Sequence, residues 1–346
     1  MKVGLVAGYS PAKMSLPMDL ILEAESLGFD SVWTAEAYGS DAATPAAWIL
    51  ACTTKIKVGT AIMQMPARSP AMTAMTAMTL DSMSGGRFIL GLGPSGPQVI
   101  EGWHGVPYGR PLGRTKEYIS IIRKILDRKE PVTHEGYHYH LPYTGEGATG
   151  LGKPLKSILH GRRDMKIFTA SITPNGLRTS AEVADGVFPV WMNPERYDLF
   201  EGSLNEGFER AGGGKSLNDF EVAPFVRVVL NDDLEKAQLP VRENLALYIG
   251  GMGAREQNFY NDYAIRLGYE AAAKEIQDLF LAGKRGEAAA AVPASLIDEV
   301  SLVGSAARIR DRLQIWKAAG DKRHVGSLLA SATTPEELRV LAEVLL

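Results

Sequence analysis

The sequence has little cysteine, little net charge and no long apolar run, and each of these shortages excludes a class of protein. Cys52 is the one cysteine among 346 residues, so the chain cannot form an internal disulfide. The net charge of −3 comes without the concentrated basic face that nucleic acid or an anionic membrane would require. No apolar run could span a bilayer, and the run that follows Met1 is too short for a secretory segment. We therefore expect a cytoplasmic protein that binds neither nucleic acid nor membrane.

The stretch from Thr79 to Gly93 contains a helix end, a turn, a buried strand and an open loop in one run. Ser84-Gly85-Gly86 ends the helix, because glycine takes positive φ without a Cβ penalty. The apolar residues from Phe88 to Leu92 suit a strand buried on both faces, as in a parallel sheet. This stretch therefore predicts one α-to-β step of an α/β protein.

The same alternation recurs along the chain. We expect strands at 3–7, 30–34, 56–61, 87–92, 165–169, 186–190, 222–230 and 325–329, and helices at 17–27, 44–52, 70–82, 176–183, 194–211, 306–319 and 335–345. Eight strands in this pattern predict a closed (β/α)₈ TIM barrel rather than an open doubly wound sheet. A minimal barrel takes roughly 250 residues, so we expect one domain over residues 1–346 with insertions at about 131–164 and 231–301.

The loops that follow the predicted strands carry few ionisable groups. Enzymes of this fold keep their chemistry on those loops, and a hydrolase or lyase would place several acid–base side chains there. Residues 36–41, 62–68 and 94–98 instead offer methionine, small residues and exposed backbone. This composition favours a broad apolar ligand whose own ring does the chemistry, as a flavin does. Met63 and Met65 are candidates for lining its pocket, whereas we expect Met72, Met75 and Met78 to pack in the core.

Three further motifs have ordinary structural explanations. The run from Ser171 to Gly176 opens a helix and could bind an anion through hydroxyls and free amides, or it could be a plain Ser/Thr cap with proline in the first turn. His134, His138 and His140 lie in a hairpin-like segment without a converging further ligand, so we expect no metal. The Gly91 and Gly93 pair is not a dinucleotide fingerprint, since no third glycine opens a helix.

Several motifs together resemble a known family. The run Leu-Asp-Ser-Met-Ser-Gly-Gly-Arg-Phe at 80–88, followed by Gly-Leu-Gly at 91–93, resembles the luciferase-like monooxygenase superfamily. That superfamily uses a (β/α)₈ barrel to bind FMN or the deazaflavin coenzyme F420. Residues 32–41, 95–105 and 300–304 are similar to the actinobacterial F420-dependent oxidoreductase branch. The resemblance covers nearly the whole chain.

The resemblance implies a role for each matching position. It implies a cis peptide bond between Ala61 and Ile62 behind the deazaflavin ring, with Glu36 at the edge of that ring. The implied cofactor contacts are Glu36, Ala61, Ile62, Met63, Gln64, Pro94, Ser95 and Gly96 around the ring, and Ser171, Ile172, Thr173, Asn175 and Gly176 at the phosphate of the tail.

The sequence departs from the family pattern at two places. Relatives often carry a glycine-rich loop after the fifth strand, whereas bulky Ile172 stands here and limits how closely backbone amides can approach a phosphate. The sugar-phosphate dehydrogenases of the family have a catalytic histidine where this chain has Ala37, so that reaction is not expected. Glu36, Tyr38 and His104 remain as alternative proton donors.

The resemblance implies an F420-dependent oxidoreductase that transfers a hydride between the deazaflavin C5 and an unidentified small organic substrate. Two alternatives stay open at this point. A reduced-FMN monooxygenase could use the same fold, and a barrel could bind a flavin without catalysis. Because large barrels of this kind often dimerise through helices, we also expect a homodimer.

Overall fold

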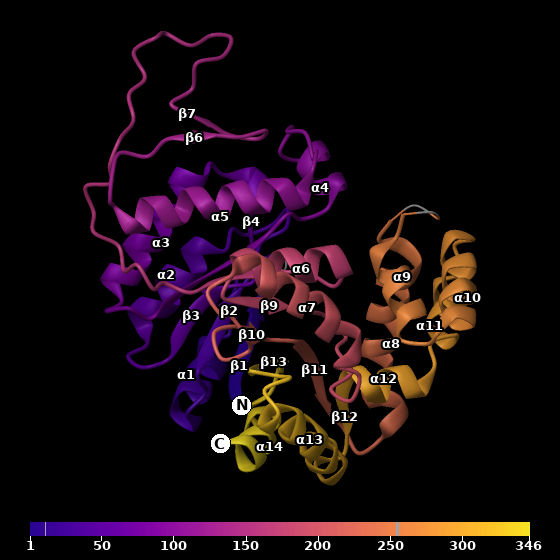
Figure 1. The fold of residues 1–346 in the computed structure, drawn as a ribbon. Coiled ribbons are helices and arrows are strands. Elements are labelled where there is room, and N and C mark those ends of the chain that lie inside the picture. Colours follow the sequence, from indigo (N-terminus) through magenta and orange to yellow (C-terminus); the bar gives the residue numbers. More distant parts are fainter. Residues whose placement is uncertain (11, 254, 256) are drawn as a thin grey trace.

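Parallel strands curl into a closed barrel inside a ring of helices in the computed structural model, which describes residues 1–10, 12–253, 255 and 257–346 (Figure 1). The first half of the chain contains β1 (Lys2–Gly8), α1 (Met18–Leu27), β2 (Ser31–Thr34), α2 (Ala43–Cys52), β3 (Lys57–Thr60), β4 (Met63–Gln64), the 3₁₀ turn η1 (Met65–Ala67), α3 (Pro70–Met83), β5 (Phe88–Gly93), α4 (Pro97–Gly102), α5 (Pro111–Asp127), β6 (His134–Glu135), β7 (His140–Leu141) and β8 (Ile167–Ala170). The second half contains α6 (Pro174–Val183), β9 (Gly186–Phe188), α7 (Asp198–Ala211), β10 (Glu221–Val222), β11 (Phe225–Leu230), α8 (Leu234–Gly251), α9 (Phe259–Arg266), α10 (Glu270–Leu281), α11 (Arg285–Ala290), α12 (Ala294–Val300), β12 (Ser301–Gly304), α13 (Ala306–Asp321), β13 (Ser327–Ser331) and α14 (Pro335–Leu345).

The strand order β10-β9-β8-β5-β3-β2-β1-β13-β11-β12 confirms the predicted barrel. Neighbouring strands in this order are parallel. The barrel closes where Val190 pairs with Phe225, and where Phe225 N donates to Pro189 O at 3.1 Å. The strand predicted at 222–230 is divided into β10 and β11 at Pro224, because proline has no N–H to donate to a ladder.

Strand β12 and helix α5 are among the elements that were not predicted from the sequence. Strand β12 pairs with the second half of β11, from Arg227 to Leu230. No loop separates it from α12, which ends at the residue before it. Four apolar or small residues directly after a helix give no turn signal, so the insertion was expected to remain helical there. Helix α5 was also missed, although Pro111 starts it and Ile119, Ile122 and Leu126 form its buried stripe.

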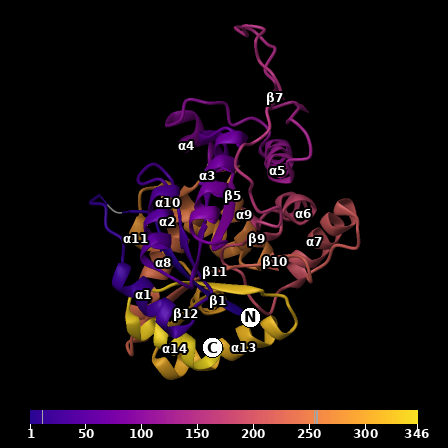
Figure 2. The ribbon, with the colours of Figure 1, turned by 90° about the vertical axis from the view of Figure 1, so that its left-hand side faces the viewer.

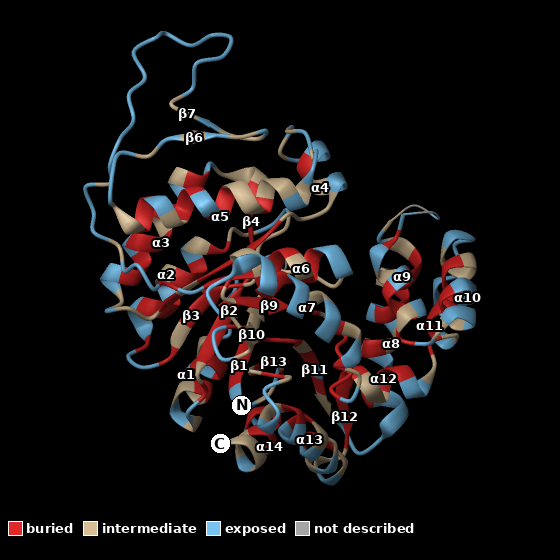
Figure 3. Ribbon diagram, in the orientation of Figure 1, coloured by how far each residue is buried: buried red, intermediate tan, exposed pale blue. Residues whose placement is uncertain are grey.

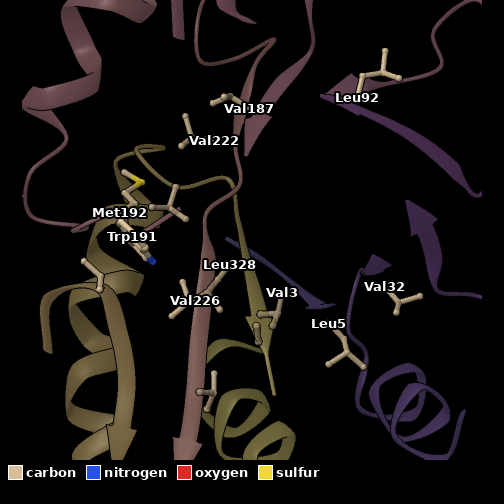
Figure 4. Packing of buried hydrophobic residues seen from close by; sticks show 14 of the residues in the cluster. Val3, Leu5, Val32, Leu92, Val187, Trp191, Met192, Val222, Val226 and Leu328 are labelled. Atoms are coloured by element: carbon tan, nitrogen blue, oxygen red, sulfur yellow. The ribbon is translucent and has the colours of Figure 1, made fainter. Parts of the chain in front are cut away.

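The barrel interior is filled by aromatic rings. Trp33 packs edge-on against Phe188 with ring centroids 5.0 Å apart, and Phe168 stacks on Phe188 at 5.2 Å. A Cβ at Gly59 would lie 2.2 Å from the Trp33 ring, so this strand position needs glycine. The layer between strands and helices is aliphatic instead, and Figure 4 shows Val3, Leu5, Val226 and Leu328 among the buried side chains of that layer.

The helices bury one face and expose the other (Figure 3). On α3, Met78 is buried as predicted, but Met72 and Met75 are 53% and 56% exposed, so their prediction as core residues is wrong. The reason is the period of the helix: the buried positions Thr73, Ala74 and Ala77 form the inner stripe, and the two methionines lie outside it. Among the described residues, no helix combines the length and the hydropathy that crossing a membrane requires.

The two segments expected as insertions lie on different sides of the barrel. Residues 131–164 contain the predicted hairpin, β6 paired antiparallel with β7, and an extension that stands clear of the barrel (Figures 1 and 2). Glu117 of α5 ties the hairpin down, because its carboxylate accepts from the backbone N–H groups of Tyr137, His138 and Tyr139. Residues 234–300 form helices α8 to α12 at another flank of the barrel.

Candidate active site

The carboxyl ends of β2, β3 and β5 bring most of the expected ring-binding residues to one end of the barrel. Glu36 follows β2, and its backbone N–H donates to Ile62 O at 3.3 Å. The peptide bond between Ala61 and Ile62 is cis, as the resemblance implied. Gln64 of β4 then pairs beside Gly93 at the end of β5. Residues far apart in the sequence therefore meet because parallel strands end at the same edge.

Glu36 is held entirely by hydrogen-bond donors. Its Oε1 accepts from Gln64 N at 2.7 Å and from the Arg68 guanidinium at 2.5 Å, and its Oε2 accepts from Ala42 N at 3.0 Å. The side chain of Glu36 is 6% exposed and that of Arg68 is 21% exposed, so the ion pair is largely shielded from water. A carboxylate in such a setting is arranged as an acceptor and an anchor.

Gln64 joins this carboxylate to His104. The Gln64 Nε2 atom donates to Ala37 O at 3.0 Å and approaches Glu36 O at 3.4 Å. On the other side of the same amide, Oε1 lies 2.7 Å from His104 Nε2. His104 comes just after α4 and is partly exposed. The structure thus brings together two of the three candidate proton donors, Glu36 and His104, through one buried side chain.

The floor of this site is apolar. Ala61 and Ile62 are partly exposed and pack on the aromatic interior of the barrel. A Cβ at Gly93 would lie 2.7 Å from the Ile62 side chain, so glycine at the exit of β5 keeps the Ile62 position open. This apolar shelf lies against Trp33, Phe168 and Phe188 and offers a weakly polar surface at the mouth of the barrel.

The methionines expected to line the pocket do not face it. The side chains of Met63 and Met65 are 1% and 0% exposed and belong to the main hydrophobic core. The prediction of a pocket lined by these side chains is therefore wrong. Residues in β4 alternate in direction like those of any strand, but η1 follows at once and turns Met65 back into the core.

Pro94, Ser95 and Gly96 form the next wall, and each is partly exposed. Ser95 has a left-handed backbone with φ of 58°, and its carbonyl oxygen accepts from the Tyr108 hydroxyl at 3.1 Å. Burial raises the pKa of Tyr108, although Arg114 acts in the opposite direction, which keeps this hydroxyl protonated as a donor. The loop is therefore held in place by a side chain from the segment that follows α4.

The run from Ser171 to Gly176 is an N-cap built from hydroxyls. Thr173 caps α6, since its Oγ1 accepts from Gly176 N at 3.1 Å. A Cβ at Gly176 would lie 1.9 Å from Ser171 Oγ, so the small residue lets both hydroxyls crowd the helix start. Asn175 is exposed, and its Oδ1 accepts from Arg178 at 2.6 Å. The cap is present, and phosphate binding by it stays a prediction.

Arg266 is a neighbour of this loop that sequence reasoning missed. It comes from α9 in the segment 231–301, and its Nη2 donates to Ile172 O at 2.6 Å. Its guanidinium also lies 5.2 Å from the Tyr263 ring centroid. Burial lowers the pKa of Arg266, while Tyr263 and Asp262 act in the opposite direction. Nothing near Arg266 in the sequence marks it, because 94 positions separate it from its partner.

Tyr38, the third candidate proton donor, lies apart from the Glu36 network. Its side chain is 71% exposed. It lines a cavity of about 630 Å³ between the loops that follow β1 and β2, together with Tyr9, Met14 and Asp41. The structure therefore gives Tyr38 a place in the wall of an open pocket and no bond to Glu36 or His104 in the described part of the chain.

An aromatic wall was also missed from the sequence. Trp191, after β9, lies 5.4 Å from the ring of Tyr260 and 5.8 Å from that of Tyr248. Burial raises the pKa of both tyrosine hydroxyls, so they stay protonated. The residues of this wall come from a strand end and two insertion helices, which no local pattern connects.

The three hairpin histidines have separate surroundings. His134 Nε2 lies 3.3 Å from Glu117 Oε2, and His140 Nε2 lies 3.1 Å from Glu135 Oε1. The ring of His138 packs edge-on against Tyr137. Their neighbourhood is that of a structural hairpin anchor.

Comparisons with known proteins agree with this architecture. The family model described as luciferase-like monooxygenase matches residues 7–323. A Mycobacterium tuberculosis protein named, by inference, as a coenzyme F420-dependent oxidoreductase is 44% identical over 344 residues, which cover 99% of this chain and 98% of the relative. The 5,10-methylenetetrahydromethanopterin reductase of Archaeoglobus fulgidus is 27% identical over 86% of this chain and 84% of its own length.

Two solved structures share the fold. The coenzyme F420-dependent tetrahydromethanopterin reductase from Methanopyrus kandleri has a TM-score of 0.77 at 23% identity, with 99% of this chain and 98% of that chain covered. An F420-dependent secondary alcohol dehydrogenase, solved with an F420-acetone adduct, has a TM-score of 0.76 at 19% identity and the same coverage. The barrel and its surrounding helices are thus common to these proteins and this chain.

Proposed function

The chain belongs to the luciferase-like monooxygenase family, and from this membership we propose that it is an F420-dependent oxidoreductase. It transfers a hydride between C5 of the deazaflavin and a small organic substrate. The observation that carries the proposal is the 44% identity, over nearly the full length of both chains, to the mycobacterial protein that is named by inference as an F420-dependent oxidoreductase. Its cytoplasmic location is part of the same proposal, supported by a lone, free cysteine.

The residues at the mouth of the barrel fit a deazaflavin. The apolar shelf of Ala61 and Ile62 suits one face of a flat ring, and Pro94 to Gly96 form a side wall with exposed backbone. Ser171 and Thr173 place hydroxyls at the start of α6, where a phosphate group gains from the helix dipole. When bound, F420 supplies or accepts the hydride at C5.

The protein's own contribution is to position the substrate and to move a proton. Glu36, held by Arg68 and two backbone amides, anchors β4 at the edge of the ring site. His104 is the proton carrier, because it is partly exposed and bonded into the same network. The substrate lies between the ring and the aromatic wall of Trp191, Tyr248 and Tyr260, where it is shielded from water.

Titration of the purified protein with F420 tests the cofactor. We expect saturable quenching of F420 fluorescence with a Kd in the micromolar range, on the order of −8 kcal/mol, and at least tenfold weaker binding of FMN. An oxygen electrode reports on the reduced-FMN monooxygenase alternative. Tight FMN binding with oxygen uptake and no response to F420 would contradict the proposal, and no affinity for either ring would favour a non-catalytic barrel.

We also propose that the protein is a homodimer joined through α2 and α3. Trp48 on α2 is 61% exposed, and Met72, Met75 and Met83 on α3 are 53%, 56% and 81% exposed. Large apolar side chains gathered on two neighbouring helices mark an interaction surface. A two-fold axis would pair this surface with its own copy.

The double variant Met72→Glu/Met75→Glu is expected to be monomeric. Light scattering should give twice the 37.4 kDa chain mass for the wild type and 37.4 kDa for the variant. Leu281→Glu is the control, because Leu281 is similarly exposed, at 48%, on the distant helix α10. A wild-type protein that elutes as a monomer would refute the dimer.

A further inference from the structure

We propose that Gln64 is a positioning residue that fixes the tautomer of His104, with the hydrogen on Nε2 and the exchangeable proton on Nδ1. The inference rests on the proposed function for its catalytic meaning, since His104 serves there as the proton carrier. The tautomer itself follows from the hydrogen bonds of one buried amide, that of Gln64.

The orientation of the Gln64 amide follows from its neighbours. The side chain is buried, with 2% exposure. Its nitrogen faces two backbone carbonyl oxygens, those of Glu36 at 3.4 Å and Ala37 at 3.0 Å. Carbonyl oxygens only accept, so the NH₂ group of the amide must lie on that side. The amide oxygen therefore faces His104.

This orientation decides the tautomer of the imidazole. The Gln64 oxygen lies 2.7 Å from His104 Nε2 and can only accept, so Nε2 must donate. Nε2 then carries a hydrogen in both the neutral and the protonated ring. Within the described part of the chain, Nδ1 of His104 has no hydrogen-bond partner, which leaves this atom to face a ligand.

The backbone of Gln64 is fixed as firmly as its side chain. Gln64 N donates to Glu36 Oε1 at 2.7 Å, and the same oxygen accepts from Arg68. The chain of contacts runs from Arg68 through Glu36 and Gln64 to His104, and every link in it is between groups of the protein. The imidazole is thus oriented in advance, as an efficient proton carrier requires.

The proton step balances in both directions. In reduction, the reduced deazaflavin would supply a hydride with its two electrons to one atom of the substrate, while Nδ1–H of His104 gives a proton to the neighbouring atom and the imidazolium becomes neutral. In oxidation, a substrate hydroxyl gives its proton to Nδ1, and the oxidised deazaflavin would accept the hydride from its carbon. The Nε2–H bond to Gln64 stays intact throughout, so the ring does not need to turn between steps.

Long-range ¹H–¹⁵N spectra of the ¹⁵N-histidine protein measure the tautomer without any cofactor. The chain has six histidines, and the ring signal that disappears in the His104→Asn variant is assigned to His104. At a pH where the ring is neutral, we expect this signal to show the Nε2–H form. In Gln64→Leu the ratio of the two tautomers should move toward Nδ1–H by about fivefold or more, the equivalent of one hydrogen bond.

Two further variants keep the test decisive. Gln277→Leu replaces another buried glutamine, on α10, and should leave the His104 signal unchanged. Gln64→Asn serves if the leucine variant does not fold, because it keeps the amide and shortens its reach to His104. A wild-type His104 in the Nδ1–H form, or a tautomer ratio unmoved in both Gln64 variants, would overturn the inference. F420 titration of the same proteins reports separately on the proposed function.

Discussion

Replacing Glu36 with alanine is expected to lower the free energy of unfolding by about 3 kcal/mol and to weaken F420 binding by about tenfold or more. The substitution leaves the Arg68 guanidinium without its shielded partner and removes the acceptor for the backbone N–H groups of Ala42 and Gln64. Both Gln64 and the edge of the ring site then lose their anchor. Urea unfolding measures the stability, and fluorescence titration measures the F420 affinity.

A double variant separates the charge effect from the geometric effect. Glu36→Gln with Arg68→Met removes both charges, so its stability should exceed that of Glu36→Gln alone. Glu135→Ala is the surface control, because the Glu135 side chain is 85% exposed and its loss should cost less than about 0.5 kcal/mol. If the free energy of unfolding of Glu36→Ala lies within about 1 kcal/mol of the wild-type value, the ion pair does not hold this site together.

Replacing Arg87 with alanine is expected to cost about 3 kcal/mol of stability and to leave F420 affinity unchanged within about twofold. The Arg87 guanidinium lies at the amino end of β5, opposite the ring site, and joins three segments of the chain. It donates to Leu50 O at 2.7 Å, Ile56 O at 2.8 Å, Thr53 O at 3.0 Å, Thr53 Oγ1 at 3.1 Å and Ser84 O at 3.1 Å. Alanine would leave these acceptors without their charged donor.

Urea unfolding and F420 titration, carried out at a temperature where the variant is folded, check both halves of this expectation. Arg339→Ala is the matched control, because Arg339 is half exposed and pairs with the partly exposed carboxylate of Glu23 and the exposed carboxylate of Glu336. Its loss should change stability by less than about 1 kcal/mol. Reduced F420 affinity in folded Arg87→Ala would mean that the run at 80–88, which contains Arg87, contributes to the F420 site.

The fold could be predicted where its signals are local. Helix α3 ends at Met83, Gly85 and Gly86 follow with positive φ of 68° and 90°, and β5 starts at Phe88, all close to expectation. Glycine conformation and apolar runs act over a few residues, so the sequence records them directly. Strand β12 has no such signal. Its place in the sheet comes from pairing with β11, which lies about 75 positions earlier in the chain.

The site was predictable at the strand ends and not beyond them. The barrel topology alone brings Glu36 beside Ile62. The bond from Gln64 to His104, by contrast, depends on the path of the loop around α4. The aromatic wall depends on how α8 and α9 dock against Trp191. Both are set by packing between distant segments, which a single sequence does not display.

The pairing of β12 with β11 has a consequence for how this protein can change over evolution. The chain leaves the barrel at Asn231, whose N–H donates to Gly304 O at 3.0 Å, and it returns at Ser301 beside Arg227. Exit and return are therefore both fixed to one strand, which pairs with β13 from Phe225 to Arg227. Helices α8 to α12 therefore form one excursion whose two ends are held by the same strand. A change in the length of this excursion would leave the register of the barrel strands as it is.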